Sequence, residues 1–171
     1  MLIKKYSKQQ MYTVRETEEV YKRVTKTQYL DSLDMSHCDW MYNVIDNKKE
    51  QELTVFENEH FKLQKDYKFN EGDLSTLYLL AIPTTKTLKS VRDLTADHLP
   101  MLKSILEESY KVIQSKFKVP QHKILAILHY LPTYWLLHVH FIHIDKQSRD
   151  ARDHISLEAV INNIEMKSDY Y

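Results

Sequence analysis

The chain has 171 residues, 43% of them hydrophobic and 28% charged, which is enough for one globular domain or one domain with an appendage. Lys and Arg together number 24, as do Asp and Glu, so the charge balance gives no basis for bulk nucleic-acid binding. The single cysteine excludes an internal disulfide, the single glycine excludes a phosphate loop built on several glycines, and no apolar run is long enough for a membrane span or signal peptide. We therefore expect a protein of the cytoplasm or nucleus that is not secreted.

The first part of the chain predicts a helix and then a hairpin. Residues 11–27 combine many charges with β-branched Thr and Val, and predict a helix followed by an extended segment. The stretches WMYNVID (residues 40–46) and ELTVFE (residues 52–57) flank the polar sequence NKKE (residues 47–50). This pattern predicts two strands joined by a turn.

Two further strands are expected next. Residues 61–69, FKLQKDYKF, alternate apolar with polar side chains and predict a half-exposed strand. Residues 77–82, LYLLAI, form a continuous apolar run that ends at Pro83. Such a run is typical of a central strand that is buried on both faces.

A long helix opens the second half of the chain. Thr95 is a plausible N-cap, and apolar residues then recur at spacings of three and four until the chain reaches Pro120. Residues 123–130 and 136–145 predict strands, and residues 152–165 predict a final helix. The expected fold class is therefore α+β, with a mostly antiparallel sheet and packed helices.

Three histidines stand out in the strand-forming region. His138 and His140 lie two residues apart in an apolar run, so both side chains should point to one face of a strand. Pro132 cannot donate a ladder hydrogen bond and indicates a bend that would bring His129 near the pair. Imidazoles serve as nucleophiles, as acids or bases, and as metal ligands, or they simply pack in a sheet. A zinc site is the weaker choice because His143 should face the other way.

Residues 129–141, HYLPTYWLLHVHF, resemble the histidine-triad stretch of the scavenger mRNA decapping enzymes. The resemblance extends from about Lys5 to Asn163 and includes WMYNVID, VFEN, LYLLAI and RDLTADHLP. It implies a histidine-triad domain that hydrolyses the residual 7-methylguanosine cap of degraded mRNA, as m7GpppN or a short capped oligonucleotide. It further implies that 7-methylguanosine monophosphate is released through a covalent histidine intermediate, without a metal or another cofactor.

By this resemblance His138 occupies the position of the nucleophile, and His140 and His129 stand beside the phosphates. The chain departs from the family motif H-x-H-x-H at Leu136, which replaces the first histidine. We expect the chemical step to survive, with changed orientation or proton handling. Two alternatives stay open: a cap-binding module with weakened catalysis, and a general histidine-triad nucleotide hydrolase.

The resemblance also implies substrate contacts. Trp40 matches a tryptophan that stacks on the cationic methylguanine, and Glu50 matches a glutamate that accepts from the guanine N–H groups. Asp66 and Lys68 match positions near the ribose and phosphates, while Tyr67 replaces an aliphatic residue and could form an aromatic sandwich with Trp40. A core Trp, a turn Glu and a solvated strand face are the ordinary alternatives. The remaining candidates are Thr133, Tyr134, Lys5 and Arg152, with Arg149 as the alternative to Arg152.

The family organisation supplies the last expectations. Residues 1–30 correspond to a hinge-like segment and residues 31–171 to the catalytic domain. The lid domain that precedes this part in the family, and is exchanged between the subunits of a dimer, is expected to be absent. The chain also stops short of a further strand and helix that relatives carry. We expect a homodimer through the histidine-triad core, with a small capped nucleotide as substrate and no membrane partner.

Overall fold

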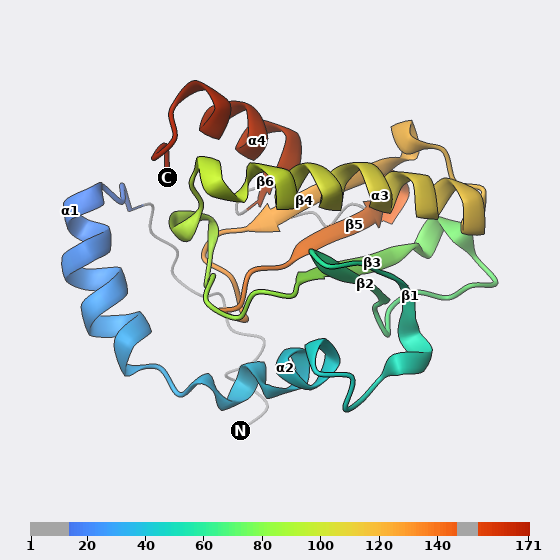
Figure 1. The fold of residues 1–171 in the computed structure, drawn as a ribbon, viewed down its shortest axis with the longest axis horizontal. Coiled ribbons are helices and arrows are strands. Elements are labelled where there is room, and N and C mark those ends of the chain that lie inside the picture. The colour runs from blue at the N-terminus through green and yellow to red at the C-terminus, as the bar shows by residue number, and fades with distance from the viewer. Residues whose placement is uncertain (1–13, 147–153) are drawn as a thin grey trace, which may run out of the picture. The chain divides into compact units, whose positions relative to one another are not determined.

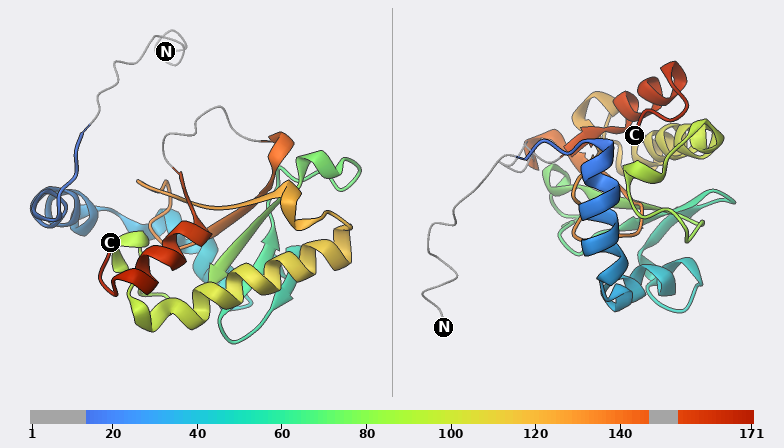
Figure 2. Two further views of the ribbon diagram at one scale, coloured as in Figure 1. Left: turned by 90° about the horizontal axis from the view of Figure 1, so that it is seen from above. Right: turned by 90° about the vertical axis from the view of Figure 1, so that its left-hand side faces the viewer.

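The computed structural model describes residues 14–146 and 154–171 (Figures 1 and 2). Contacts between residues divide the chain into two units, Met1–Asp34 and Met35–Tyr171. In the described part of the chain, the strands belong to the second unit, where they form one sheet.

The first unit, described from Val14 onward, is helical. The Thr17 side chain caps the short helix α1 (Glu18–Val20) by accepting a hydrogen bond from the Val20 amide. A π-helical segment, Tyr21–Tyr29, follows α1 directly and continues the helix. The expected helix is therefore present, but it runs past Thr27 without the extended segment that we predicted there.

Within its described residues, the second unit is built on a six-stranded antiparallel sheet with the strand order β1-β2-β3-β5-β4-β6. Its strands are β1 (Thr54–Glu57), β2 (Phe61–Lys65), β3 (Tyr78–Pro83), β4 (Ile124–His129), β5 (Val139–His143) and β6 (His154–Ser156). Its α-helices are α2 (Asp39–Ile45), α3 (Leu99–Phe117) and α4 (Leu157–Met166). Short 3-10 turns occupy Leu30–Ser32 in the first unit and Met35–Cys38, Gln51–Leu53, Leu74–Thr76, Val91–Asp93, Ala96–His98, Gln121–Lys123 and Ile144–Lys146 in the second.

The two faces of the sheet have different neighbours. Helices α3 and α4 cover one face (Figure 2). The main apolar core lies between these helices and side chains of the sheet such as Phe61, Leu79 and Phe141. Helix α2 packs on the other face, where Met41 contacts a second apolar cluster that contains Leu80. The sheet therefore has one fully packed face and one that is only partly covered by a helix.

The register of the strands aligns polar groups on the partly covered face. Gln64 pairs with Leu80, Leu80 with His140, and His140 with Ile127. Directly opposed residues of neighbouring strands place their side chains on the same face of a sheet. These four residues therefore form one row across β2, β3, β5 and β4.

The predicted long helix is confirmed. Thr95 and His98 form a capping box for the turn Ala96–His98, and α3 follows with Pro100 in its first turn, where an amide proton lacks a partner in any case. Helix α3 ends at Phe117, and the residue that follows, Lys118, has a left-handed φ of 59°. The buried central strand expected at residues 77–82 is also confirmed as β3.

The strand predicted at Trp40–Asp46 is wrong, because the segment is the helix α2. Met41 and Val44 are the buried residues of this helix, and their spacing of three matches a helical stripe and not a strand. They pack against Ile82 in the second apolar cluster. The second predicted strand of the hairpin is present as β1.

The half-exposed strand predicted at residues 61–69 is shorter and more buried than expected. Strand β2 ends at Lys65, and the Phe69 amide donates to the Asp66 carbonyl across a turn at 2.9 Å. Lys62 and Gln64, which we expected to face solvent, are only 5% and 2% exposed. They tolerate burial because neighbouring side chains provide hydrogen-bond partners, such as Glu57, which lies 3.0 Å from Lys62.

The C-terminal elements differ from the prediction in their limits. Strand β4 matches the expectation to within a residue, but β5 is shorter than residues 136–145 and begins just after His138. The expected final helix begins only at Leu157, where Ser156 caps it by accepting from the Ala159 amide. The preceding short strand β6 was not predicted.

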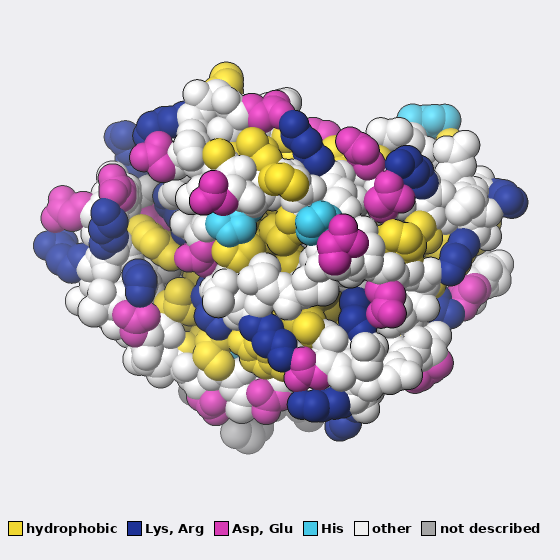
Figure 3. Space-filling view, in the orientation of Figure 1, with side chains coloured by type: hydrophobic (Ala, Val, Ile, Leu, Met, Phe, Trp, Pro, Cys, Tyr) yellow, Lys and Arg dark blue, Asp and Glu magenta, His cyan; other side chains and the backbone are white. Residues whose placement is uncertain are grey.

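The surface carries charges of both signs. On the face seen in Figure 3, Lys and Arg side chains are interspersed with Asp and Glu, as the balanced composition suggests. Within residues 14–146 and 154–171, none of the helices combines the length and apolar character needed to cross a bilayer.

Candidate active site

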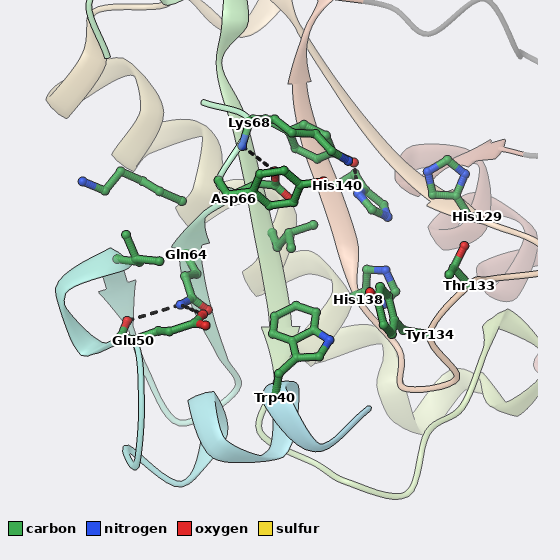
Figure 4. A pocket seen from close by; sticks show the side chains of 15 residues that line it. Trp40, Glu50, Gln64, Asp66, Lys68, His129, Thr133, Tyr134, His138 and His140 are labelled. Atoms are coloured by element: carbon green, nitrogen blue, oxygen red, sulfur yellow. Dashed lines mark hydrogen bonds between the residues drawn. The ribbon is translucent and has the colours of Figure 1, made fainter. Parts of the chain in front are cut away.

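A pocket of about 560 Å³ lies on the partly covered face of the sheet (Figure 4). Its lining includes all ten of the sequence-predicted site residues that fall within the described part of the chain, and every one belongs to the second unit. Five further residues line it: Leu53, Gln64, Lys65, Tyr78 and Leu80. Lys5, Arg149 and Arg152 lie outside the described residues.

His138 is held in one orientation by the backbone. Its Nδ1 lies 2.7 Å from the carbonyl oxygen of Leu136, and because a carbonyl can only accept, Nδ1 must carry the proton. The other ring nitrogen, Nε2, is then unprotonated in the neutral imidazole. Burial lowers the pKa of His138 below its ordinary value of 6.5, against the opposing effect of the bond to Leu136. His138 is therefore a neutral imidazole at physiological pH, held in one orientation with its Nε2 unprotonated.

Leu136 supports this geometry in spite of its side chain. The side chain is 1% exposed and packs in the second apolar cluster, while the carbonyl group makes the bond to His138. A backbone carbonyl is present whatever the residue type. The replacement of a histidine at this position therefore leaves the orientation of His138 intact.

His140 is oriented by a tyrosine. The Tyr78 hydroxyl lies 2.8 Å from His140 Nδ1, and burial raises the pKa of Tyr78 to about 12, so the hydroxyl keeps its proton. Among the described residues the hydroxyl has no second hydrogen-bond acceptor, and donation to Nδ1 places the His140 proton on Nε2. This Nε2 is buried and has no hydrogen-bond partner in the described part of the chain. It is a donor that a phosphate oxygen can satisfy.

The three predicted histidines come together as the sequence suggested. The His138 and His140 ring centroids are 4.8 Å apart, and those of His129 and His140 are 4.4 Å apart. His154 on β6, which sequence reasoning did not single out, lies 5.9 Å from His129. Burial, and then the neighbouring imidazoles, lower the pKa of His140 well below 6.5. His140 is therefore neutral near pH 7, as is His138.

Stability should fall on acidification because His138 and His140 are buried in their neutral forms. Their pKa values are lowered in the folded state, so below about pH 6.5 the unfolded chain binds more protons than the folded one. The contribution of the two neutral histidines to the free energy of unfolding should be fully present above this pH. Below it, the free energy of unfolding should decrease by up to about 2.7 kcal/mol per pH unit for two protons. Urea unfolding between pH 7.5 and 5.5 measures this slope.

The double variant His138→Asn/His140→Asn is expected to flatten that slope. The exposed His122 provides a matched control for the loss of a histidine, and His122→Asn should retain the wild-type slope. A slope that is the same in the double variant and the wild type would contradict the assignment of the two buried imidazoles as neutral.

Trp40 and Glu50 also line the pocket, and Figure 4 shows Glu50 beside Gln64 and Trp40 nearer to Tyr134. Trp40 stands at the start of α2 and packs edge-on against Tyr134, with ring centroids 5.5 Å apart. Glu50 has a left-handed φ of 60°, and its carboxylate accepts a hydrogen bond from Gln64 at 3.0 Å. An aromatic face and a carboxylate are thus available to one planar, hydrogen-bonding ligand.

The Asp66–Lys68 turn forms another wall. The Lys68 amide donates to Asp66 Oδ1 at 2.8 Å, so the two residues lie in a turn and not on a strand face as expected. Tyr67 is 86% exposed, so its ring lies outside the core, as an aromatic sandwich with Trp40 would require. The Lys68 ammonium lies 5.0 Å from the centroid of the Tyr78 ring. Thr133 completes the lining near His129 and His138.

Gln64 and Tyr78 are the site residues that sequence reasoning missed. The alternation of residues 61–69 predicts that Gln64 faces solvent, and Tyr78 falls within an apolar run. Only the strand register, which a single sequence does not specify, places Gln64 in one row with His140 and Tyr78 on the same face. As for metals, the described residues contain no cluster of three or more His, Cys, Asp or Glu side chains that could hold an ion.

The antiparallel sheet, with α3 and α4 on one face and a histidine-lined pocket on the other, defines an α+β protein of the histidine-triad class. A solved structure of the aprataxin ortholog Hnt3 in complex with DNA has the same fold, with a TM-score of 0.54 at 13% identity over 75% of this chain and 76% of that one. Residues 39–154 match the family described as "Scavenger mRNA decapping enzyme C-term binding". The chain belongs to this family, which confirms the resemblance found in the sequence.

Curated relatives extend the match over nearly the whole chain. The m7GpppX diphosphatase of Bos taurus is 40% identical over 99% of this chain and 51% of its own length. The m7GpppX diphosphatase of Ascaris suum is 35% identical over 99% of this chain and 58% of its own length. The chain thus spans about half the length of the curated relatives that it matches.

Proposed function

We propose that the chain hydrolyses 7-methylguanosine-capped dinucleotides or short oligonucleotides and releases 7-methylguanosine monophosphate. The observation that carries this proposal is His138, whose Nδ1 is held by the Leu136 carbonyl so that Nε2 is free to attack. The names of the relatives, which are m7GpppX diphosphatases, support the substrate class.

In the first step His138 Nε2 attacks the phosphorus next to the methylguanosine. An N–P bond forms, the bridging P–O bond breaks, and its electron pair leaves with the nucleoside diphosphate. The imidazole becomes cationic, and the Leu136 carbonyl stabilises that charge through the Nδ1 proton. In the second step water attacks the same phosphorus, the N–P bond breaks, and the water proton passes to solvent.

The neighbouring groups stabilise charge during both steps. His140 Nε2–H is a preorganised donor for a non-bridging phosphate oxygen, and Lys68 supplies a positive charge at the pocket wall. Trp40 offers a face for the methylguanine cation and Glu50 offers acceptors for its N–H groups. Such a division separates recognition of the base from chemistry at the phosphate.

Titration calorimetry followed by chromatography tests the proposal. 7-Methylguanosine mono- and diphosphate should both bind more tightly than their unmethylated counterparts, and a capped dinucleotide should yield 7-methylguanosine monophosphate and a nucleoside diphosphate. Failure to bind either mononucleotide would overturn the assignment. Tight binding without product would favour a cap-binding module, and equal use of unmethylated dinucleotides would favour a general nucleotide hydrolase. A homodimer and a cytoplasmic or nuclear location stay predictions.

Tyr78→Phe should lower kcat about tenfold, with little change in the dissociation constant for the product nucleotide, because the variant no longer fixes the proton of His140 on Nε2. The ¹⁵N chemical shifts of His140 should report a mixture of tautomers in the variant. Tyr110→Phe is the matched control, since the Tyr110 hydroxyl also makes a hydrogen bond but donates to Glu158 on the other side of the sheet. An unchanged tautomer in Tyr78→Phe would refute this role.

A further inference from the structure

Gln64 occupies an unusual position for a polar side chain. It lies in the middle of β2, is 2% exposed, and lines the pocket beside Glu50 (Figure 4). Its row across the sheet also contains His140, two strands away. Neighbouring strands are about 4.8 Å apart, so Gln64 and His140 are separated by about 10 Å, which is the scale of one nucleotide from its base edge to its 5′-phosphate.

The hydrogen bonds of Gln64 determine how its amide group points. Nε2 donates to the Glu50 carboxylate at 3.0 Å and to the Glu50 carbonyl at 3.2 Å. Both Glu50 atoms can only accept, so the amide cannot be turned over without losing both bonds. Gln64 thus anchors Glu50, whose left-handed backbone conformation is uncommon for a residue with a side chain.

The same orientation leaves the other end of the amide without a partner. Gln64 Oε1 is buried and accepts no hydrogen bond from any described residue. A buried carbonyl oxygen without a donor is unfavourable, and such groups commonly have a functional explanation. Here the group lies beside a carboxylate at the end of the pocket where Trp40 offers its ring.

Together, Glu50 and Gln64 present two acceptors to a ligand. A purine satisfies both only if its edge carries adjacent N–H donors, as guanine does with N1–H and the 2-amino group. Hypoxanthine has N1–H alone, and adenine has an acceptor at N1. We propose that Gln64 is a specificity-determining residue that fixes the Glu50 carboxylate and adds an acceptor, so that the pocket selects purines with a 2-amino group. This inference rests on the proposed function, which places the base at this end.

Calorimetry with two nucleotides tests the role of Gln64. 7-Methylguanosine monophosphate and 7-methylinosine monophosphate differ only in the 2-amino group, and the wild-type chain should bind the first about 10- to 100-fold more tightly. Gln64→Met keeps the length of the side chain but has no amide, and should reduce this ratio about three- to tenfold. If the role of Gln64 were purely structural, the substitution would lower the affinity for both nucleotides equally and leave the ratio of the two affinities unchanged.

Ser109→Ala is the matched control. Ser109 is also fully buried, and its hydroxyl has no partner among the described residues, but it lies in α3 on the other side of the sheet. Its removal should leave the ratio at the wild-type value. The proposal is overturned if Gln64→Met shows the wild-type ratio.

A measurement on the wild-type chain covers the case in which Gln64→Met does not fold. The ¹H and ¹⁵N signals of the Gln64 amide should shift on binding 7-methylguanosine monophosphate and shift much less with the inosine analogue at saturation. Equal shifts would overturn the role of Gln64 while leaving the proposed function in place. Binding of neither nucleotide by the wild-type chain would overturn both proposals.

Discussion

His138→Asn is expected to lower kcat for a capped dinucleotide by at least about 10⁴-fold, because the variant has no nucleophile at the floor of the pocket. Binding of 7-methylguanosine monophosphate should stay within about threefold of wild type, since the proposed base contacts are made by Trp40 and Glu50 and not by His138. Chromatography of the reaction and calorimetry of the product measure the two effects separately.

His143→Asn is the matched control for this variant. His143 is the last residue of β5, the strand that begins just after His138, and has the same 8% exposure, but its ring lies near Asp145 and not in the pocket. The His143→Asn variant should therefore retain activity. In the wild-type chain, an alkaline quench during turnover should also reveal a mass increase of one methylguanosine monophosphate unit on His138. Wild-type turnover by His138→Asn would remove this residue from the mechanism.

The parts of the fold that the sequence predicts are those where periodicity and burial agree. The apolar run of β3 and the three-and-four spacing of α3 each leave one reasonable interpretation, and both are confirmed. Trp40–Asp46 is too short for periodicity to separate a helix from a strand. Its helical conformation depends on contacts of Met41 and Val44 with residues far along the chain, including Leu80.

The site residues also separate into those that the sequence predicts and those that it does not. Alternation alone predicts that His138 and His140 share a face, and the resemblance brings in Trp40 and Glu50 from a distant segment. The role of Gln64 depends on which residues of β2, β3 and β5 stand opposite one another, and a single sequence does not specify that register. The support that Leu136 gives to His138 comes from a carbonyl group, which every residue has, so the side-chain pattern carries no signal for it.

Trp40→Leu should decrease the affinity for 7-methylguanosine monophosphate about 100-fold, because it removes both the ring area and the attraction between the ring face and the methylguanine cation. Unmethylated guanosine monophosphate has a neutral base, so its affinity should fall less, and the preference for the methylated ligand should nearly vanish. Calorimetry with both ligands at constant ionic strength measures this ratio.

Trp135→Phe provides the control for losing a tryptophan, because Trp135 is 1% exposed and does not line the pocket. That variant should reduce stability and preserve the preference for the methylated base. Trp40→Phe should restore part of the preference, since a smaller ring still offers a π face. If Trp40→Leu kept the wild-type preference, the exposed ring of Tyr67 would have to supply the stacking surface. The preference for the methylated base would then depend on Tyr67 and not on Trp40.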